Sequence, residues 1–463
     1  MVHQYINNGY HIVLDVNSGS VHVVDEMVYE LIAFLKEEEK NDSKIDEERI
    51  AKAVSHFQGT YAENDVREAL EELNALIEAG QLFAEDVYEP YVKEFKKRET
   101  VVKALCLHIA HDCNLACKYC FAEEGEYHGR RALMSFEVGK KALDFLIANS
   151  GSRRNLEVDF FGGEPLMNFE VVKQLVAYGR EQEKIHNKNF RFTLTTNGVL
   201  LNDDILEFLN KEMANVVLSI DGREEVNNKM RPFRNGKGSY ELIVPKFQKV
   251  AESRKQTNYY VRGTFTRNNL DFSEDVLHLA DLGFEQISVE PVVAAETEDY
   301  ALREEDIPVI CEQYDKLAKE MVKRSKEGKC FNFFHFMIDL QGGPCVAKRI
   351  SGCGSGTEYL AVTPWGDFYP CHQFVGEEKF LLGNVDTGIV NTDIVETFKG
   401  CNVYAKDKCK NCFSKFYCSG GCAANSYNFH GSINDVYEVG CELQRKRVEC
   451  AIMIKAALAE EEA

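Results

Sequence analysis

Three cysteines in the stretch HDCNLACKYCFAEEG carry the strongest chemical signal of this sequence. Cys113, Cys117 and Cys120 have the spacing C-x3-C-x2-C, which places three thiols in one short loop. Thiolates bind zinc and iron–sulfur clusters, and both kinds of site normally take four protein ligands. Three ligands leave one metal position open, and an open position distinguishes a reactive metal site from a structural one. A more distant thiol such as Cys106 could instead close a zinc site.

Three glycine-containing motifs follow this loop, and each ends a short apolar run: GGEP at 162–165, TTNG at 195–198 and SIDG at 219–222. Six such runs alternate with longer segments of helical pattern, which predicts parallel βα units and a partial six-stranded barrel. Chemistry in such a sheet belongs at the carboxyl ends of its strands, so we expect the cysteine loop and the three motifs at one mouth. The predicted strands are 104–110, 156–163, 190–198, 216–222, 259–266 and 286–291.

CNLACKYCFA on a first strand, followed by GGEP after a second, closely resembles the radical S-adenosylmethionine (SAM) superfamily over about residues 104 to 300. The resemblance implies that Cys113, Cys117 and Cys120 hold a 4Fe-4S cluster, and that the amino and carboxylate groups of SAM chelate its open iron. Glycines allow close backbone approach to such a ligand, and a carboxylate accepts from its ammonium. The implied cofactor-binding residues are Gly162, Gly163, Glu164, Tyr119 beside the adenine, Ser219 and Asp221 at the ribose, and Asn197. Without that context, Asn197, Ser219 and Asp221 indicate turns or helix caps.

A second group of cysteines lies in a loop-rich region that begins near residue 345. Its order resembles the SPASM extension of peptide-modifying radical enzymes, and it consists of Cys353-x12-Gly366-x4-Cys371, then Cys409, Cys412, Cys418, Cys422 and Cys441. The resemblance implies two auxiliary 4Fe-4S clusters, hence three in the chain. One would be held by Cys409, Cys412, Cys418 and Cys441, and the other by Cys353, Cys371 and Cys422.

These seven thiolates are one short of the eight that two fully ligated cubes need. Either Cys345 completes the set or one iron stays open and can bind a substrate thiol as thiolate. The paired cysteines alone could also form a zinc ribbon. Four further cysteines have no place in the pattern and are interpreted as buried or free thiols: Cys311, Cys330, Cys401 and Cys450.

The first 90 residues predict a separate small unit. HIVLDV and VHVV flank the turn NSGS, which is typical of a β-hairpin, and amphipathic helices are expected over about 26–36, 46–57 and 63–79. This arrangement is winged-helix-like. By pattern alone, a structural or dimerising module is the alternative.

The whole chain resembles the SPASM-containing maturases of six-cysteine (SCIFF) peptides, which install thioether cross-links in short ribosomally made, cysteine-rich substrates. The resemblance implies a 5′-deoxyadenosyl radical that abstracts hydrogen from a peptide α-carbon, after which a substrate thiolate bonds that carbon. It also implies a cysteine-rich precursor peptide whose leader binds the amino-terminal unit, and an external low-potential electron donor. The expected domains are a leader-recognition domain (1–90), a linker (91–103), the radical SAM partial barrel (104–330), the SPASM domain (331–450) and an acidic tail (451–463). The ending AALAEEEA is typical of a frayed acidic helix.

Composition narrows the partners further. The net charge of −21 argues against a nucleic acid or an anionic membrane as the main partner. No apolar run approaches the ~18 residues of a membrane span, and the first residues do not have a signal-peptide pattern, so a cytoplasmic protein is expected. In that reducing compartment, sixteen cysteines favour metal ligation over disulfides.

Two kinds of alternative stay open. The first keeps the radical machinery and changes the product: a sulfatase-type formylglycine maturase or a carbon–carbon cross-linking enzyme. The leader-recognition unit argues against the sulfatase type. The second is a non-enzymatic zinc-ribbon adaptor whose winged helix binds a partner, which iron and labile-sulfide analysis would distinguish from the enzyme.

Overall fold

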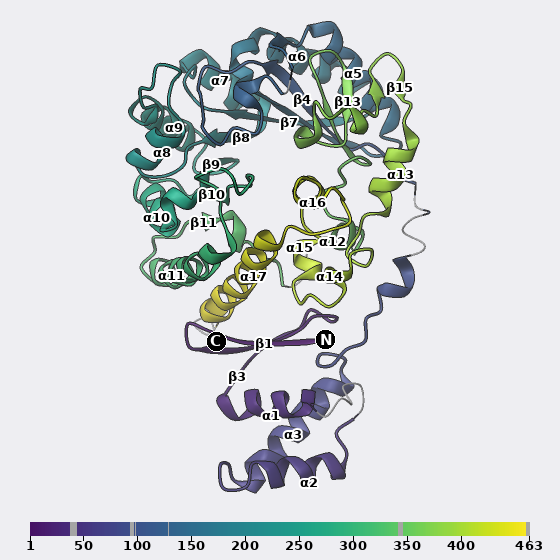
Figure 1. Cartoon of the computed structure of the whole chain (residues 1–463), viewed down its shortest axis with the longest axis vertical. Coiled ribbons are helices and arrows are strands. Elements are labelled where there is room, and N and C mark those ends of the chain that lie inside the picture. Colours follow the sequence, from purple (N-terminus) through teal and green to yellow (C-terminus); the bar gives the residue numbers. More distant parts are fainter. Residues whose placement is uncertain (38–43, 93–96, 98, 128, 341–345, 460–463) are drawn as a thin grey trace.

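The structure is a computed structural model that describes residues 1–37, 44–92, 97, 99–127, 129–340 and 346–459. Its centre is a curved parallel sheet, and Figure 1 shows the strands following an arc around the upper part of the molecule. The six predicted strands are confirmed as β4 (Ala104–His111), β6 (Asn155–Gly162), β7 (Asn189–Thr196), β8 (Met213–Ser219), β9 (Tyr259–Phe265) and β10 (Gln286–Pro291). Neighbours along this series pair in parallel, so the partial (β/α)6 barrel is confirmed.

Helices cover the outer face of the barrel sheet because one side of each strand is apolar. In β6, for example, Leu156, Val158 and Phe160 are fully buried and belong to the main core. The helix that precedes β6 begins at Ser135, whose hydroxyl accepts the backbone N–H of Val138 and so caps it. The barrel helices are α5 (Phe136–Asn149), α6 (Phe169–His186), α7 (Asp203–Glu212), α8 (Glu224–Met230), α9 (Tyr240–Ser253), α10 (Phe272–Asp281) and α11 (Ile307–Lys326).

The carboxy-terminal region continues the barrel sheet beyond the predicted boundary at residue 330. On one side β11 (Asn332–Phe333) pairs with β10, and on the other β12 (Tyr359–Val362) pairs in parallel with β4. The remaining strands are β5 (Ala132–Leu133), β13 (Asp367–Tyr369), β14 (Gly383–Asn384) and β15 (Gly388–Ile389). Short helices complete the region: α12 (Val346–Ser351), α13 (Thr392–Gly400), α14 (Asp407–Lys410), α15 (Lys415–Cys418) and α16 (Ala423–His430).

The described residues from 451 to 459 do not form the separate acidic tail that the sequence predicted. They form the end of α17 (Glu438–Ala459), in which Ile452, Met453 and Ala457 are buried. The helix packs against α11 and runs down to the amino-terminal sheet (Figure 1). Apolar side chains that face two partners stabilise this segment despite its acidic ending.

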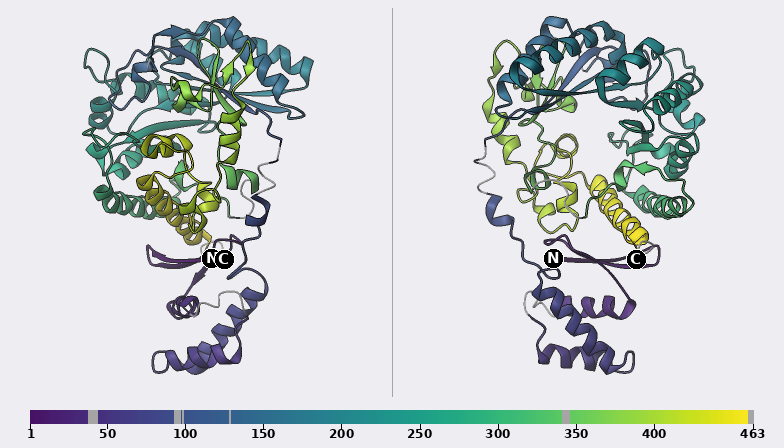
Figure 2. Two further views of the ribbon diagram at one scale, coloured as in Figure 1. Left: turned by 45° about the vertical axis from the view of Figure 1, so that its right-hand side comes forward. Right: turned by 180° about the vertical axis from the view of Figure 1, so that it is seen from behind.

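The amino-terminal unit contains the predicted hairpin and three helices, and one further strand. The hairpin is β2 (Tyr10–Asp15) and β3 (Val21–Val24), and β1 (Val2–Asn7), which the sequence did not indicate, pairs with β2. The helices are α1 (Glu26–Glu37), α2 (Glu47–His56) and α3 (Glu63–Glu78). Figure 2 shows the sheet lying across the end of α17, with the three helices extending away from the barrel.

The two faces of this small sheet belong to different cores. Val2 and Val13 pack with the three helices, whereas Tyr5, Ile12 and Leu14 pack with the main core of the chain. The unit is therefore joined to the barrel by buried apolar contacts rather than by the linker alone. None of the described helices is long and apolar enough to cross a membrane.

Candidate active site and cysteine groups

The loop that carries Cys113, Cys117 and Cys120 leaves the end of β4 and is held by the segment after α8. The N–H of Ala116 donates to the Pro232 carbonyl at 2.9 Å, and the N–H of Lys118 donates to the Met230 carbonyl at 2.9 Å. These bonds fix the loop over the mouth of the barrel. All three cysteines line one cavity of about 280 Å³ at that mouth.

Gly162 and Gly163 pack β6 against the backbone that enters the cysteine loop. Gly162 has a φ of +122°, and an added Cβ would lie 2.4 Å from the Ala110 carbonyl oxygen. At Gly163 the Cβ would lie 2.1 Å from the Asp112 carbonyl oxygen. Both glycines line the cavity, but close approach to this loop already requires them without a ligand.

Glu164 lies buried at the cavity wall. Its carboxylate accepts from the backbone N–H of Leu166 (3.0 Å) and of Asn197 (2.8 Å), and from the Thr196 hydroxyl (2.8 Å). Burial raises the pKa of this carboxyl, and these hydrogen bonds oppose the shift. A carboxylate has about four acceptor sites, so three protein donors leave one for a ligand.

Asn197 and Ser219 line the same cavity, as the sequence predicted. The Asn197 amide donates to the Asn114 side-chain oxygen at 2.7 Å, and its own oxygen accepts the N–H of Val199 at 3.1 Å. Asn197 therefore stabilises the cysteine loop as well as facing the cavity. Ser219 is half-buried at the last position of β8.

Asp221 lies behind the cavity wall instead of lining it. Its fully buried carboxylate accepts the Tyr119 hydroxyl at 2.7 and 2.9 Å and the Thr264 backbone N–H at 3.0 Å. Burial raises the pKa of Asp221 to about 6, although the nearby Arg231 charge lowers it. The carboxylate thus anchors Tyr119, which does line the cavity, and its predicted contact with the ribose stays a prediction.

Arg231 is a cavity residue that the sequence did not indicate. It is 8% exposed, and one of its terminal nitrogens donates to the Tyr119 hydroxyl at 2.8 Å. Its Nε is buried and has no hydrogen-bond partner among the described residues. Buried N–H groups are rarely left unpaired, so this group could donate to an acceptor atom of a ligand in the cavity. Its position in the loop-fixing segment after α8 becomes evident only in the fold.

Two more cavity residues lie at strand positions that a barrel model could have suggested. Arg262 is on β9 and Glu290 is on β10, near the carboxyl ends where the cavity opens. A third, His372, follows Cys371 in the region after β13. The cavity therefore joins residues of the barrel with residues of the carboxy-terminal region.

Electrostatic effects connect several of the carboxy-terminal cysteines within each predicted group, and the ligand sets themselves stay a prediction. Burial raises the pKa of Cys371, and the charges of Cys422 and Cys353 raise it further. In the other group burial raises the pKa of Cys418 to about 11, with added contributions from Cys409 and Cys412. The pKa of Cys441 is likewise raised by burial and by the charges of Cys418 and Cys412. Mutual electrostatic effects of this kind require that the thiols of each group lie near one another.

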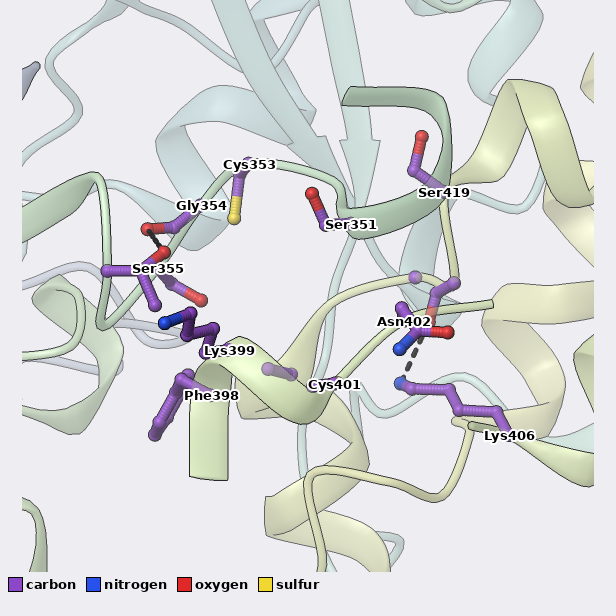
Figure 3. A pocket seen from close by; sticks show the side chains of 14 residues that line it. Ser351, Cys353, Gly354, Ser355, Phe398, Lys399, Cys401, Asn402, Lys406 and Ser419 are labelled. Carbon is purple, nitrogen blue, oxygen red and sulfur yellow. Dashed lines mark hydrogen bonds between the residues drawn. The ribbon is translucent and has the colours of Figure 1, made fainter. Parts of the chain in front are cut away.

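Two further cysteines are candidates for the group of Cys353, Cys371 and Cys422. Cys345 lies outside the described residues, so its ligand role stays a prediction. Cys401, interpreted from the sequence as a thiol without a role, lines a small cavity together with Cys353 (Figure 3). Of the remaining unassigned thiols, Cys450 is buried, Cys311 is half-buried and Cys330 is exposed.

The spacing of the thiols fits clusters better than single zinc ions. Zinc–sulfur bonds of about 2.3 Å in a tetrahedral site place neighbouring sulfurs roughly 3.8 Å apart. Among the described residues, no three cysteine sulfurs lie within 4.8 Å of one another. A 4Fe-4S cube distributes its ligands over different irons and accepts wider spacing. All three cysteine groups are therefore compatible with cubes.

Comparisons with known proteins agree with this geometry. Residues 107–282 match the family model described as Radical SAM superfamily. The chain is 25% identical over 352 residues to a cysteine-type anaerobic sulfatase-maturating enzyme of Clostridium novyi, covering 72% of this chain and 90% of that protein. It is 21% identical over 460 residues to the radical SAM cyclopropyl synthase TigE of Paramaledivibacter caminithermalis, covering 92% and 89%.

Among solved structures, Streptococcus suis SuiB bound to precursor peptide SuiA matches with a TM-score of 0.52 and 15% identity, over 94% of this chain and 97% of that one. This likeness supports the overall fold. The match to the radical SAM family model covers residues 107–282, and an anaerobic sulfatase-maturating enzyme is among the proteins to which the chain is similar.

Proposed function

We propose that this protein is a peptide maturase that forms thioether cross-links between a cysteine sulfur and an α-carbon of a ribosomally made, cysteine-rich precursor. The observation that supports it best is the presence, in one chain, of the cavity at Cys113, two further cysteine groups and an amino-terminal unit with an open groove. TigE and SuiB match over more than nine-tenths of the chain, whereas the sulfatase-maturating relative covers 72% of it. That difference favours a peptide substrate over a sulfatase.

The cavity residues fit a cluster with SAM. Cys113, Cys117 and Cys120 would hold the cluster, and Arg231 Nε and the remaining acceptor site of Glu164 would meet the carboxylate and the ammonium of the cofactor. When bound, cluster and cofactor supply a one-electron reduction that yields a hydrogen-abstracting radical. Tyr119 would help to orient the bound cofactor, and the buried walls of the cavity would exclude water from it.

The reaction removes two hydrogen atoms from the substrate. An S–H and a Cα–H bond are replaced by one S–C bond; one hydrogen leaves as an atom, and the other leaves as a proton with an electron. The two carboxy-terminal groups, Cys409/Cys412/Cys418/Cys441 and Cys353/Cys371/Cys422, would hold the clusters that provide acceptors for that electron. An external low-potential electron donor, which we expect to be a cytoplasmic one, would supply the electron that reduces the cluster at Cys113, Cys117 and Cys120.

The amino-terminal unit offers a groove that suits a leader peptide. The groove lies between β3, which is the free edge of its sheet, and α3. Val21, Val23 and Val28 line it together with Leu73 and Leu76. An edge strand can add a peptide strand through backbone hydrogen bonds, while apolar pockets select its side chains.

The direct test is mass spectrometry of a candidate precursor encoded beside this gene, before and after anaerobic incubation with SAM and a reductant. A thioether link predicts a loss of two hydrogens per link and one thiol that no longer reacts with an alkylating agent. A carbon–carbon link would lose two hydrogens and leave every thiol alkylatable. Conversion of cysteine to formylglycine would remove sulfur from the peptide. Either of the last two results would contradict thioether formation.

Leader binding can be tested by substitutions inside the groove. Deleting residues 1–90 is unsuitable because Ile12 and Leu14 belong to the main core. We expect Val23→Asp and Leu76→Asp each to weaken leader binding roughly tenfold or more, because each removes an apolar contact that the bound leader would cover. Val23 is exposed in the free protein. Fluorescence anisotropy with a labelled leader measures this.

The matched control is Ala75→Asp, which adds the same charge at an exposed position of α3 outside the groove. It is expected to bind the leader normally. Cofactor cleavage without peptide should be unchanged in all three variants. Unchanged leader affinity in both groove variants would assign the unit another role.

The missing eighth ligand gives a further prediction. We expect Cys345→Ala to lose about four irons, those of one cube, because Cys345 precedes Cys353 by only eight positions. Cys401→Ala, which removes the thiol that shares the small cavity with Cys353, is expected to retain them. Iron content and spectra of the anaerobically reconstituted proteins check this. Full iron in Cys345→Ala would instead support an open iron or ligation by Cys401.

A further inference from the structure

Lys406 carries a buried positive charge in the carboxy-terminal region. It lies directly before α14 and is 3% exposed. Its ammonium donates to the carbonyl oxygens of Gly420 (2.9 Å) and Asp435 (2.9 Å) and to the Ser426 hydroxyl (3.5 Å). All three acceptors are uncharged. A buried ammonium normally costs several kcal/mol unless an opposite charge compensates it, so this lysine needs a negative partner.

The charge of Lys406 acts on thiols of both cysteine groups. Burial raises the pKa of Cys409 to about 11, and Lys406 opposes the shift. Lys406 acts in the same direction on Cys422, which belongs to the other group, and on Cys401. The small cavity drawn in Figure 3 is lined by Lys406 together with Cys353 and Cys401. Gly420, whose carbonyl accepts from the ammonium, stands in the sequence between Cys418 of one group and Cys422 of the other, so the ammonium lies close to both groups.

We propose that Lys406 is a positioning residue that raises the reduction potentials of both auxiliary clusters. The inference rests on the proposed function, which assigns clusters to these two cysteine groups. A thiolate-ligated cluster is negatively charged, and reduction adds a further electron, so a fixed buried cation stabilises the reduced state. The clusters supply in turn the negative charge that the buried ammonium needs. Higher potentials make these clusters better acceptors of the electron that leaves the substrate.

The test measures potentials rather than turnover. Full-length protein with Cys113, Cys117 and Cys120 replaced by Ala is reconstituted anaerobically, so that only the carboxy-terminal clusters contribute to the spectra. Lys406→Met removes the charge at similar length, and Lys406→Arg keeps it. Electron paramagnetic resonance at controlled potentials should show both auxiliary clusters shifted to more negative potentials in Lys406→Met and close to the parent in Lys406→Arg. Lys379→Met, which removes an exposed lysine that pairs with Glu377, should leave them unchanged.

The iron content and the potentials of the Lys406 variants together support or overturn the proposal. Full iron with unchanged potentials in Lys406→Met overturns the proposal. If that variant loses iron, Lys406→Gln is titrated in its place, and unchanged potentials there overturn it equally. Loss of iron from the Met and Gln variants but not from the Arg variant would show that the clusters depend on the positive charge at position 406. Loss of iron from the Arg variant as well would show a steric role and overturn the proposal. Parent protein without labile sulfide would refute the proposed function itself, which separates the two failures.

Discussion

Replacing Cys113, Cys117 and Cys120 together by alanine is expected to abolish reductive cleavage of SAM and to leave the carboxy-terminal clusters in place. The three thiols line the cavity at the barrel mouth, while Cys353 lines a different one. Each cube carries four irons, so the variant should lose about four. Iron and sulfide analysis and the yield of 5′-deoxyadenosine measure both parts of this prediction.

The control is Cys330→Ala, which removes an exposed thiol that belongs to none of these groups. It is expected to retain its iron and its cleavage activity. Continued 5′-deoxyadenosine formation by the triple variant would refute the assignment. Loss of all iron from the triple variant would show that the two cysteine regions do not assemble independently.

Arg231→Met should raise the dissociation constant for SAM by about 10- to 100-fold. Arg231 Nε is buried, faces no partner among the described residues and belongs to a side chain that lines the cavity. A hydrogen bond to a charged group contributes about 1.5–3 kcal/mol, which corresponds to that range. Arg231→Lys keeps the charge but loses the planar fork of donors and should be intermediate. Anaerobic equilibrium dialysis with labelled cofactor gives the constants.

Lys229→Met is the matched control, because Lys229 is an exposed cation two positions earlier whose amine donates to Asn268. It should bind the cofactor normally. The iron content of Arg231→Met must equal that of the parent, since Arg231 also lies near Cys117. An unchanged dissociation constant at full iron content would mean that the Nε group has no role in cofactor binding.

The sequence by itself determined the parts of this protein that depend on neighbouring residues. The six barrel strands, the amino-terminal hairpin and its three helices follow from periodicity within short segments. The cysteine loop follows from the spacing of Cys113, Cys117 and Cys120. Because parallel strands present their carboxyl ends at one edge, even the common cavity of GGEP, TTNG and the first residue of SIDG could be expected.

Tertiary structure alone decided the features that join distant segments. Asp221 and Arg231 meet Tyr119 more than 100 positions away in the chain. The end of α17 is buried on several sides, so it has no apolar stripe that periodicity could detect. A lysine such as Lys406 would be expected at the surface from the sequence. It is buried because the segments carrying Gly420 and Asp435 fold over it. Burial and electrostatic partners are set by segments far along the chain, and local spacing contains no information about them.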